Sequence, residues 1–407
     1  MKNKIRFIFY CLLIISVSVF QASGADILWP EGPDLSAESA ILIDYDTGLV
    51  LYEKNADISV PPASLTKLVT LHILYSYIES GMLTMDTRVE IPREAWYTSM
   101  PPGSSIMFLG PGQHCTIRDL MMGLAVSSGN DAAVAAAYII SGDTDTFAEL
   151  MNSEVRSLGF SSMEFFEPSG ISERNSITAR EFANFCRTYI KLHPRSLKEI
   201  HNKKEFTYPR KENLIAENGQ PPITQHNRNT LIGSYPGADG LKTGYIDESG
   251  YNLAVTAVRS GTRLIGVLLG IQAESSAQGS SLRSEEGRKL LDFGFSNFIT
   301  LEPDDLEYPE PKIWKGEKDL LSINPMKKVI ITLPRNYQED LHTNISIQPF
   351  IEAPVYKGEK IGELQIFIGS SLYESFTLSA SETIEEGGFF KRVMDSMGLF
   401  FARRREN

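Results

Sequence analysis

The chain has 407 residues, of which 42% are hydrophobic and 22% charged, and this composition excludes a long disordered or fibrous protein. Its length exceeds one average domain and predicts two or three units. The formal net charge is −12, and a surface this acidic argues against nucleic acid as a partner.

Residues 1–24 are typical of a secretory signal peptide. Three basic residues precede an apolar run over 7–20, and small residues at 22–25 offer a cleavage site. An uncleaved membrane anchor is the alternative, although the run is short for a full span. Cleavage would make the net charge −15 and leave two cysteines, Cys115 and Cys186. These could pair in an oxidising compartment or remain buried thiols.

Residues 25–298 are predicted to form one α+β domain. Residues 40–54 alternate around a Gly-containing turn and predict a β-hairpin. Helical periodicity and capping signals then predict helices over 64–80, 116–124, 132–140, 144–158 and 178–189. β-Branched runs predict three strands over 240–244, 251–258 and 263–271, and a helix follows over 282–295. Strands at both ends and helices between them predict an antiparallel sheet with a helical cluster packed against it.

The pattern changes after residue 300, where prolines mark a linker. Short strand candidates at 329–333, 344–348, 361–368 and 372–378 are separated by turn residues. They predict a small all-β domain over 299–381, with no residue that we would assign to catalysis.

Residues 387–407 are predicted to form an amphipathic helix. Apolar residues recur at steps of three and four from Phe389 to Phe401, and a cluster of arginines follows at 403–405. An aromatic stripe beside concentrated positive charge is typical of a helix that lies in an anionic membrane surface. Packing of the helix on its own domain is the alternative.

The first candidate catalytic motif is a serine followed three residues later by a lysine. Ser64 begins a predicted helix, so Lys67 lies one turn later on the same face and can reach the serine hydroxyl. A serine is a poor nucleophile until a base takes its proton, and a lysine can be that base only if its pKa is lowered. Burial or a second cation, for which Lys242 is the candidate, would lower it. The free N–H of Ser64 at a helix start could help to bind an oxyanion.

Two further motifs complete this chemistry. Ser128-Gly129-Asn130 falls in a loop between two predicted helices, where Ser128 could pass a proton to a leaving amine. Asn130 could hold Lys67 and the substrate amide.

Lys242-Thr243-Gly244 lies on a predicted edge strand, to which an extended peptide can add. Thr243 and Lys242 could bind a terminal carboxylate, Gly244 would leave room for substrate, and the N–H of Tyr245 would be a second oxyanion donor. A Ser-x-x-Lys motif alone is expected about once by chance in a chain of this length, but all three motifs in this order are a specific signal.

With these motifs, the chain resembles the low-molecular-mass penicillin-binding proteins, the serine-type D-alanyl-D-alanine carboxypeptidases of peptidase family S11. The matching segments are Pro-Ala-Ser-Leu-Thr-Lys at 62–67, Ser-Ile-Met-Phe-Leu at 105–109, Ser-Gly-Asn-Asp-Ala at 128–132, Asp-Gly-Leu-Lys-Thr-Gly at 239–244, Gly-Tyr-Asn at 250–252 and Ala-Pro-Val-Tyr-Lys-Gly at 353–358. The signal peptide, the β domain and the terminal helix also match, so the resemblance covers nearly the whole chain.

The resemblance implies a β-lactamase/transpeptidase-like fold. It also implies removal of the terminal D-Ala from peptidoglycan pentapeptides through an acyl-Ser64 intermediate, and acylation of the same serine by β-lactams. No cofactor or metal is implied. The protein would be periplasmic or lie on the outer face of the cytoplasmic membrane, peripherally anchored to its anionic surface by the last helix.

Two departures from the family pattern leave alternatives open. Many relatives carry histidine where this chain has Tyr245, and many place a carboxylate-binding arginine just after the strand that ends at Gly270. This chain has Ile271-Gln272 there, and Arg283 is the candidate substitute. A DD-endopeptidase that cuts cross-links and a low-turnover penicillin-binding sensor therefore remain alternatives. A class A β-lactamase is disfavoured, because Glu167-Pro168 is not followed by the asparagine that such enzymes require.

Overall fold

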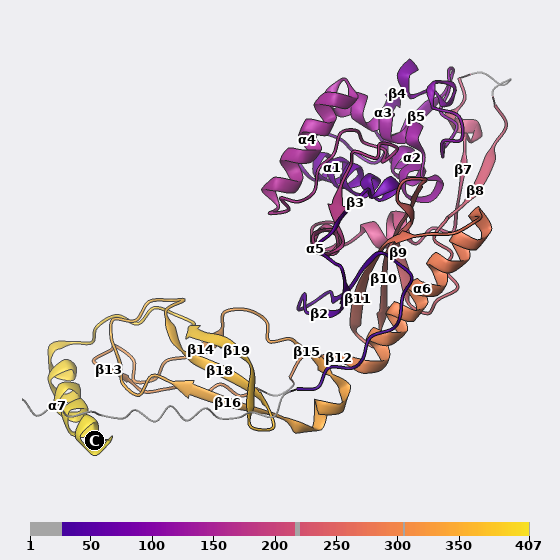
Figure 1. Cartoon of the computed structure of the whole chain (residues 1–407). Coiled ribbons are helices and arrows are strands. Elements are labelled where there is room, and N and C mark those ends of the chain that lie inside the picture. The colour runs from indigo at the N-terminus through magenta and orange to yellow at the C-terminus, as the bar shows by residue number, and fades with distance from the viewer. Residues whose placement is uncertain (1–26, 216–219, 304–305, 407) are drawn as a thin grey trace, which may run out of the picture. The chain divides into compact units, whose positions relative to one another are not determined.

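The computed structural model describes residues 27–215, 220–303 and 306–406, so the predicted signal peptide lies outside the described residues. The chain forms two compact units (Figure 1). The larger unit contains residues 29–306 and 329–338, and the smaller unit contains residues 307–328 and 339–407.

A five-stranded antiparallel sheet is the centre of the larger unit. Its strands, in spatial order, are β2 (Val50–Lys54), β1 (Ser39–Asp44), β11 (Thr262–Ile271), β10 (Gly250–Arg259) and β9 (Ala238–Ile246). The predicted hairpin over 40–54 is confirmed as β1 and β2, and the three later strands are confirmed as β9, β10 and β11. β9 is at the edge of the sheet, as the peptide-addition hypothesis requires.

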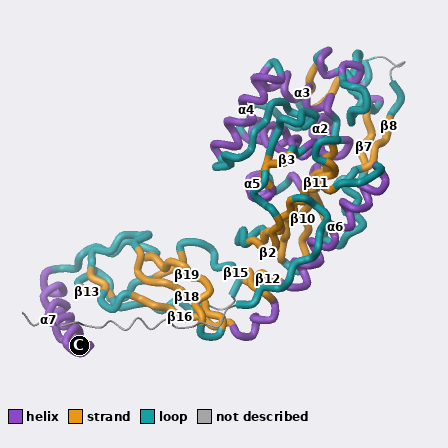
Figure 2. Tube along the Cα trace, viewed as in Figure 1, coloured by secondary structure: helices purple, strands orange, loops and turns teal. Residues whose placement is uncertain are grey.

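Helices cover both faces of this sheet (Figure 2). The α-helices are α1 (Lys67–Glu79), α2 (Ile117–Met122), α3 (Asn130–Ser141), α4 (Thr144–Ser157), α5 (Ala179–Leu192) and α6 (Ser276–Asn297). The short helices are the 3-10 helices η1 (Ala63–Thr66), η2 (Arg93–Ala95), η3 (Tyr97–Ser99) and η6 (Lys211–Asn213) and the π-helices η4 (Gly123–Ser127) and η5 (Leu197–His201). Each predicted helix is present, although the one that we expected to begin at Ser64 begins with a 3-10 turn.

The sheet separates two hydrophobic cores because successive side chains of a strand point to opposite faces. In β1, Ile41 and Ile43 join the core formed with α1 to α5, whereas Ala40 and Leu42 join the core under α6. All six residues of β1 are buried. The larger unit is therefore a sheet between two helical layers, with α6 alone on one side (Figure 1).

Local capping signals set two of the helix starts. Thr116 and Asp119 form a reciprocal capping box at α2, and the Thr178 hydroxyl accepts from the Glu181 N–H at α5. Both features were predicted. The chain after α2 continues as the π-helix η4, which the sequence pattern did not indicate.

Short ladders complete the larger unit. They pair β3 (Ser59–Val60) with β6 (Ile177–Thr178), β4 (Arg88–Glu90) with β5 (His114–Thr116), β7 (Glu205–Tyr208) with β8 (Ile223–His226), and β12 (Phe298–Leu301) with β15 (Ile331–Pro334). We expected residues 299–381 to form one β domain, but β15 belongs to the larger unit because it completes its hydrogen bonds with β12.

The smaller unit is built on β-strands and ends in a helix. Its main sheet has the order β14 (Ile323–Pro325), β19 (Ser371–Ala380), β18 (Lys360–Ile368) and β16 (Leu341–Ile347). A parallel pair joins β13 (Ile313–Trp314) to β17 (Ile351–Glu352), the 3-10 helix η7 (Arg335–Asp340) crosses the boundary between the units, and α7 (Phe389–Glu406) is last.

One face of α7 packs within the smaller unit and another remains open. Leu399 is buried, Gly398 lies against the Trp314 ring, and the Asp395 carboxylate accepts from the Lys315 N–H at 2.7 Å. The aromatic stripe is exposed, with Phe390 84% exposed. None of the helices in the described part of the chain has the length and apolar character needed to cross a membrane.

Candidate active site

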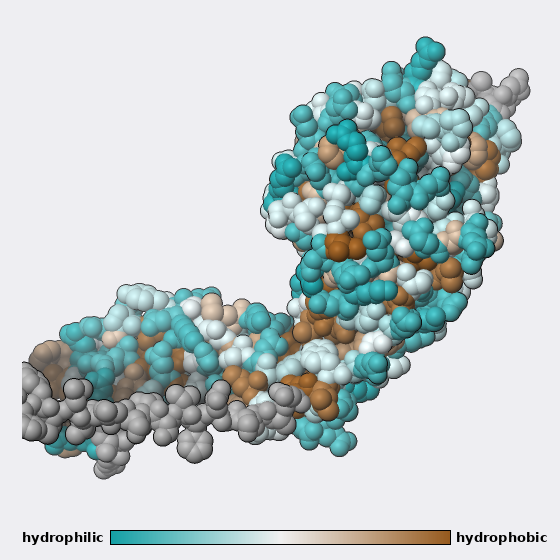
Figure 3. Space-filling view, viewed as in Figure 1, coloured by the Kyte–Doolittle hydropathy of each residue, from teal (hydrophilic) through white to brown (hydrophobic). Residues whose placement is uncertain are grey.

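A cleft in the larger unit brings most of the predicted site residues together. Its lining includes Ser64, Ser128, Asn130, Thr243, Gly244, Tyr245 and Arg283. Lys67 and Lys242 do not line the cleft, because both are buried beneath it, with Lys67 0% and Lys242 2% exposed. Polar residues cover most of the face of the larger unit seen in Figure 3, with apolar residues in small patches.

Ser64 is presented by the tight turn η1 rather than by the α-helix itself. Ala63, just before it, has a positive φ of 50°, which is uncommon for a residue other than glycine. A 3-10 helix has three residues per turn, so the side chains of Ser64 and Lys67 lie on the same side of it. The Lys67 Nζ atom is 3.0 Å from Ser64 Oγ, which is the contact that the spacing predicted.

Three oxygen atoms surround the amine of Lys67. Besides Ser64 Oγ, it contacts Asn130 Oδ1 at 2.7 Å and the carbonyl oxygen of Ser169 at 2.5 Å. Burial lowers the pKa of Lys67 to about 7, although the negative charges of Glu167 and Asp131 oppose this shift. The positive charge of Arg228 lowers the pKa of Lys67 further. Lys67 and Lys242 also repel each other when both are charged, as we expected.

The loop that carries Ser169 is held rigidly by Glu167. The Glu167 carboxylate accepts from the N–H groups of Ser169 at 2.7 Å and Gly170 at 2.6 Å, and from Asn175 Nδ2 at 3.0 Å. A Cβ atom at Gly170, where φ is +81°, would lie 1.8 Å from the Ala63 carbonyl oxygen. The carboxylate therefore shapes its own loop, in keeping with our rejection of Glu167 as a β-lactamase base.

Ser128 and Asn130 are placed by an abrupt change of backbone direction. The π-helix η4 ends at Ser127, the next residue Ser128 has a left-handed backbone with φ of 59°, and α3 begins at Asn130. Buried Asp131 fixes this turn by accepting from the N–H groups of Met107 and Leu109. A Cβ atom at Gly129 would lie 2.5 Å from an Asp131 oxygen, so this position requires glycine.

Lys242 lies beneath Ser128. Its Nζ atom is 2.9 Å from Ser128 Oγ and 3.0 Å from the backbone carbonyl oxygen of the next residue, Thr243. Burial, followed by the positive charge of Lys67, lowers the pKa of Lys242 well below its usual value. The two lysines thus approach the cleft from below, one at each serine.

Gly244 has a structural role besides the one that we predicted. A Cβ atom there would lie 2.7 Å from the Pro62 carbonyl oxygen and 3.2 Å from the Ser64 nitrogen. The missing side chain therefore lets β9 approach the turn that carries Ser64, and its role in leaving room for substrate stays a prediction. The N–H groups of Ser64 and Tyr245 belong to these two closely packed segments.

Two arginines, Arg228 and Arg283, line the cleft. Arg283 is 6% exposed and donates to the Gly244 carbonyl at 3.4 Å and the Arg228 carbonyl at 3.3 Å. Burial, and then the charge of Arg228, lower the pKa of Arg283 to about 10. Arg228 also lines the cleft, and sequence reasoning missed it because no motif surrounds it.

The cysteine alternatives are resolved by the structure. Cys115 on β5 and Cys186 on α5 are both buried free thiols, so no disulfide constrains the site. Burial raises the pKa of both thiols, which makes them poor nucleophiles.

Comparison with known proteins agrees with the geometry. Residues 28–273 match the family model described as D-alanyl-D-alanine carboxypeptidase, and residues 300–386 match that of the penicillin-binding protein 5 C-terminal domain. The chain is 33% identical to D-alanyl-D-alanine carboxypeptidase DacC of Escherichia coli, over 91% of this chain and 90% of the relative.

Solved structures agree as well. Penicillin-binding protein 5 of Haemophilus influenzae superposes with a TM-score of 0.77 at 30% identity, covering 88% of this chain and all of that one. An ampicillin-bound structure of penicillin-binding protein D2 of Listeria monocytogenes has a TM-score of 0.55 at 28% identity, covering 65% of this chain and all of that one.

Proposed function

The chain belongs to the D-alanyl-D-alanine carboxypeptidase family, and from this premise we propose that it removes the terminal D-Ala of peptidoglycan stem peptides through an acyl-Ser64 intermediate. The observation that carries the proposal is the contact between Lys67 Nζ and Ser64 Oγ, at 3.0 Å, in a buried site that lowers the pKa of Lys67 to about 7. A lysine in this state is a base that is available near neutral pH.

Acylation begins with transfer of the Ser64 hydroxyl proton to neutral Lys67. The Ser64 oxygen then attacks the carbonyl carbon of the penultimate D-Ala, and the N–H groups of Ser64 and Tyr245 stabilise the resulting oxyanion. When the tetrahedral intermediate collapses, the peptide C–N bond breaks and Ser128 donates a proton to the leaving amine. The proton that Lys67 took from Ser64 then passes to Ser128 Oγ, which Lys242 holds in place at 2.9 Å.

The leaving D-Ala carries a free carboxylate, and three residues that line the cleft suit it. Thr243 offers a hydroxyl, and Arg228 and Arg283 offer two positive charges. Guanidinium groups bind carboxylates through charge-assisted hydrogen bonds. Arg283 thus replaces the arginine that many relatives place after the strand ending at Gly270.

Hydrolysis of the acyl-enzyme requires a base a second time. Once its proton has passed to the leaving group, Lys67 is neutral again and can take a proton from water. The water oxygen attacks the ester carbon, the bond to Ser64 Oγ breaks, and the serine recovers a proton. A β-lactam follows the same first step, with opening of its ring amide in place of release of D-Ala.

The test is release of free D-Ala from a peptide ending in D-Ala-D-Ala by a protein spanning residues 26–386. We expect release by the unmodified protein and none by Ser64→Ala, in which penicillin labelling should also disappear. Labelling elsewhere in the chain would overturn the assignment of Ser64. Penicillin labelling without D-Ala release would favour the endopeptidase or the sensor, and cleavage of cross-linked peptide dimers distinguishes these two.

We also propose that the protein is exported by its signal peptide and held peripherally on the outer face of the cytoplasmic membrane by α7. The exposed aromatic stripe of α7 and its arginines support this location. Such a site would place the cleft in the compartment where peptidoglycan is found.

A further inference from the structure

The larger unit has a second pocket that shares no lining residue with the cleft. Its wall includes Arg118, Arg195, Lys198, Lys203 and Arg210, together with the apolar side chains of Met122 and Phe206. Two acidic residues, Asp119 and Glu199, also line it. Five cationic residues against two acidic ones give a local excess of three positive charges, on a chain whose net charge is −12.

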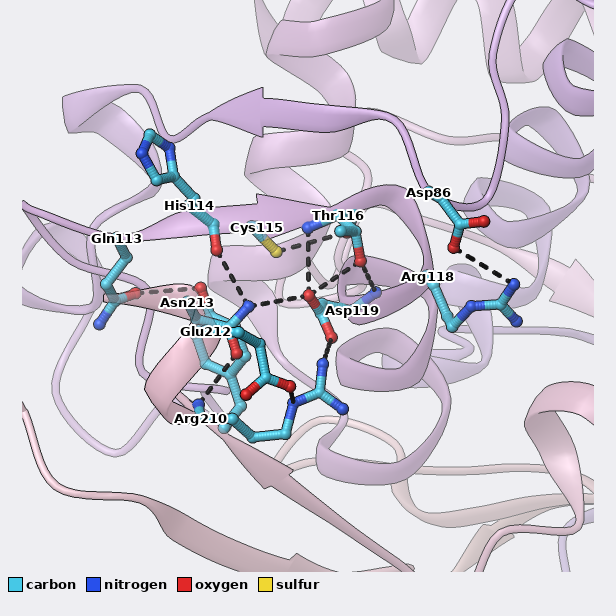
Figure 4. A network of polar contacts seen from close by, with 11 residues as sticks. Asp86, Gln113, His114, Cys115, Thr116, Arg118, Asp119, Arg210, Glu212 and Asn213 are labelled. Carbon is cyan, nitrogen blue, oxygen red and sulfur yellow. Dashed lines mark hydrogen bonds and ion pairs between the residues drawn. The ribbon is translucent and has the colours of Figure 1, made fainter. Parts of the chain in front are cut away.

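The acidic residues of this pocket are already engaged by neighbouring groups. The Asp119 carboxylate accepts from Thr116, from Arg210 Nη2 at 2.6 Å and from Asn213 Nδ2 at 3.0 Å (Figure 4). Glu199 forms an ion pair with Arg195, one turn away on the same segment. These acids orient the arginines, and neither carboxylate reaches the two lysines.

The lysines and one arginine remain available to a ligand. Among the described residues, the ammonium groups of Lys198 and Lys203 have no hydrogen-bond or ion-pair partner. Arg118 contacts Asp86 at 3.6 Å, and that carboxylate is 87% exposed (Figure 4). An ion pair this exposed contributes little and is readily exchanged.

We propose that this pocket binds a small, multiply charged oxyanion, either a phosphate or a carboxylate compound. Guanidinium groups bind such oxyanions through paired hydrogen bonds, and the lysines add mobile point charges. Met122 and Phe206 offer apolar contact to a short carbon skeleton. On a protein of net negative charge, this local excess of positive charge attracts anions to the pocket.

The position of the pocket connects it to the catalytic elements. Met122 ends α2, which continues through the π-helix η4 to Ser128. Lys198 lies on the π-helix η5, whose His201 contacts the Leu241 carbonyl oxygen, next to Lys242, at 3.2 Å. π-Helical segments occur frequently at functional sites, and here both connect the pocket with the cleft.

The experiment is calorimetric titration of the folded protein at about 0.15 M salt with two probes, inorganic pyrophosphate and tricarballylate. We expect saturable binding of at least one probe. Tighter binding of pyrophosphate identifies a phosphate ligand, and tighter binding of tricarballylate identifies a carboxylate ligand. The double variant Lys198→Gln/Lys203→Gln should bind that probe at least about tenfold more weakly. The matched control is Lys204→Gln/Lys211→Gln, which loses the same charge from lysines outside the pocket and should bind as the unmodified protein does.

Two outcomes of these titrations would overturn the proposal, and acylated protein can give a third. One is no binding of either probe, and the other is an equal loss of affinity in both double variants, which would show a diffuse charge effect. A third arm uses protein whose Ser64 has been acylated by penicillin, and here the affinity should be unchanged. If acylation abolished binding, the probe would occupy the catalytic cleft instead.

Discussion

The amine of Lys67 has contacts that distinguish its two protonation states. A neutral amine has two N–H bonds and one lone pair. Asn130 Oδ1 and the Ser169 carbonyl oxygen are acceptors, whereas the Ser64 hydroxyl can donate. Neutral Lys67 can therefore give its two hydrogens to the acceptors and point its lone pair at the Ser64 hydroxyl. This orientation prepares the base without any movement of the side chain.

We expect the rate constant of acylation by penicillin to rise with pH through a midpoint near 7. The pKa of Lys67 is lowered to about 7. Only the neutral amine, which predominates above that pH, can accept the serine proton. Stopped-flow measurement of acylation between about pH 5.5 and 8.5 checks this expectation. A rate that does not change across this range would contradict the role of Lys67 as the base.

Glu167→Gln should move that midpoint to lower pH. The negative charge of Glu167 is the largest influence that raises the pKa of Lys67, so its removal makes the ammonium form less stable. The matched control is Glu173→Gln, an exposed position in the same loop with the same change of charge. The same pH–rate profile for both variants would show that Glu167 acts on the loop alone.

For single residues, contacts between neighbours in the sequence could be predicted, whereas contacts between residues far apart in the sequence could not. Ser64 and Lys67 are three positions apart, so a helical turn brings them together without further knowledge of the fold. Ser169 contributes a backbone carbonyl from a segment about a hundred positions away. Every residue has a backbone carbonyl, so the sequence does not show which one will contact Lys67. Arg228 is a single arginine outside any motif, and only the folded sheet reveals that its charge reaches Lys67.

The close approach of β9 to η1 governs the oxyanion site. Gly244→Ala should lower the acylation rate constant by about tenfold or more, because a methyl group 2.7 Å from the Pro62 carbonyl would push the strand away from Ser64. The control is Gly110→Ala, where the nearest atom is 3.6 Å away and no strain arises. Equal acylation rates in the two variants would contradict this account of Gly244.

Elements with local signals were predicted well, and elements set by distant partners were not. The capping box at Thr116 and the side-chain cap at Thr178 lie within a few residues of the helices that they start. The π-helices have no such signal. Nor could the sequence alone assign β15 to the larger unit, since its partner β12 lies about thirty residues earlier, in a stretch that we read as part of the small β domain.

Across the whole molecule, α7 should determine membrane association. Phe390→Ser/Phe401→Ser removes two exposed rings without touching buried Leu399, and we expect binding to anionic lipid vesicles to weaken by at least about tenfold. Deletion of residues 387–407 should abolish it. Co-sedimentation measures both, and the control is Leu372→Ser, an exposed apolar residue on β19 rather than on the helix. Undiminished binding of the deletion variant would refute the anchor.

The return of β15 to the larger unit has a consequence for proteolytic shedding. Beyond Trp29 the chain passes between the units three times, near residues 306, 328 and 338. A protease that cuts the linker before residue 307 would separate the chain covalently into two fragments. The C-terminal fragment would still contribute β15 to the ladder with β12, where Ile299 is paired with Leu333. The nicked protein should therefore stay whole on a native gel, and release of the enzyme from its anchor would require a cut beyond residue 338.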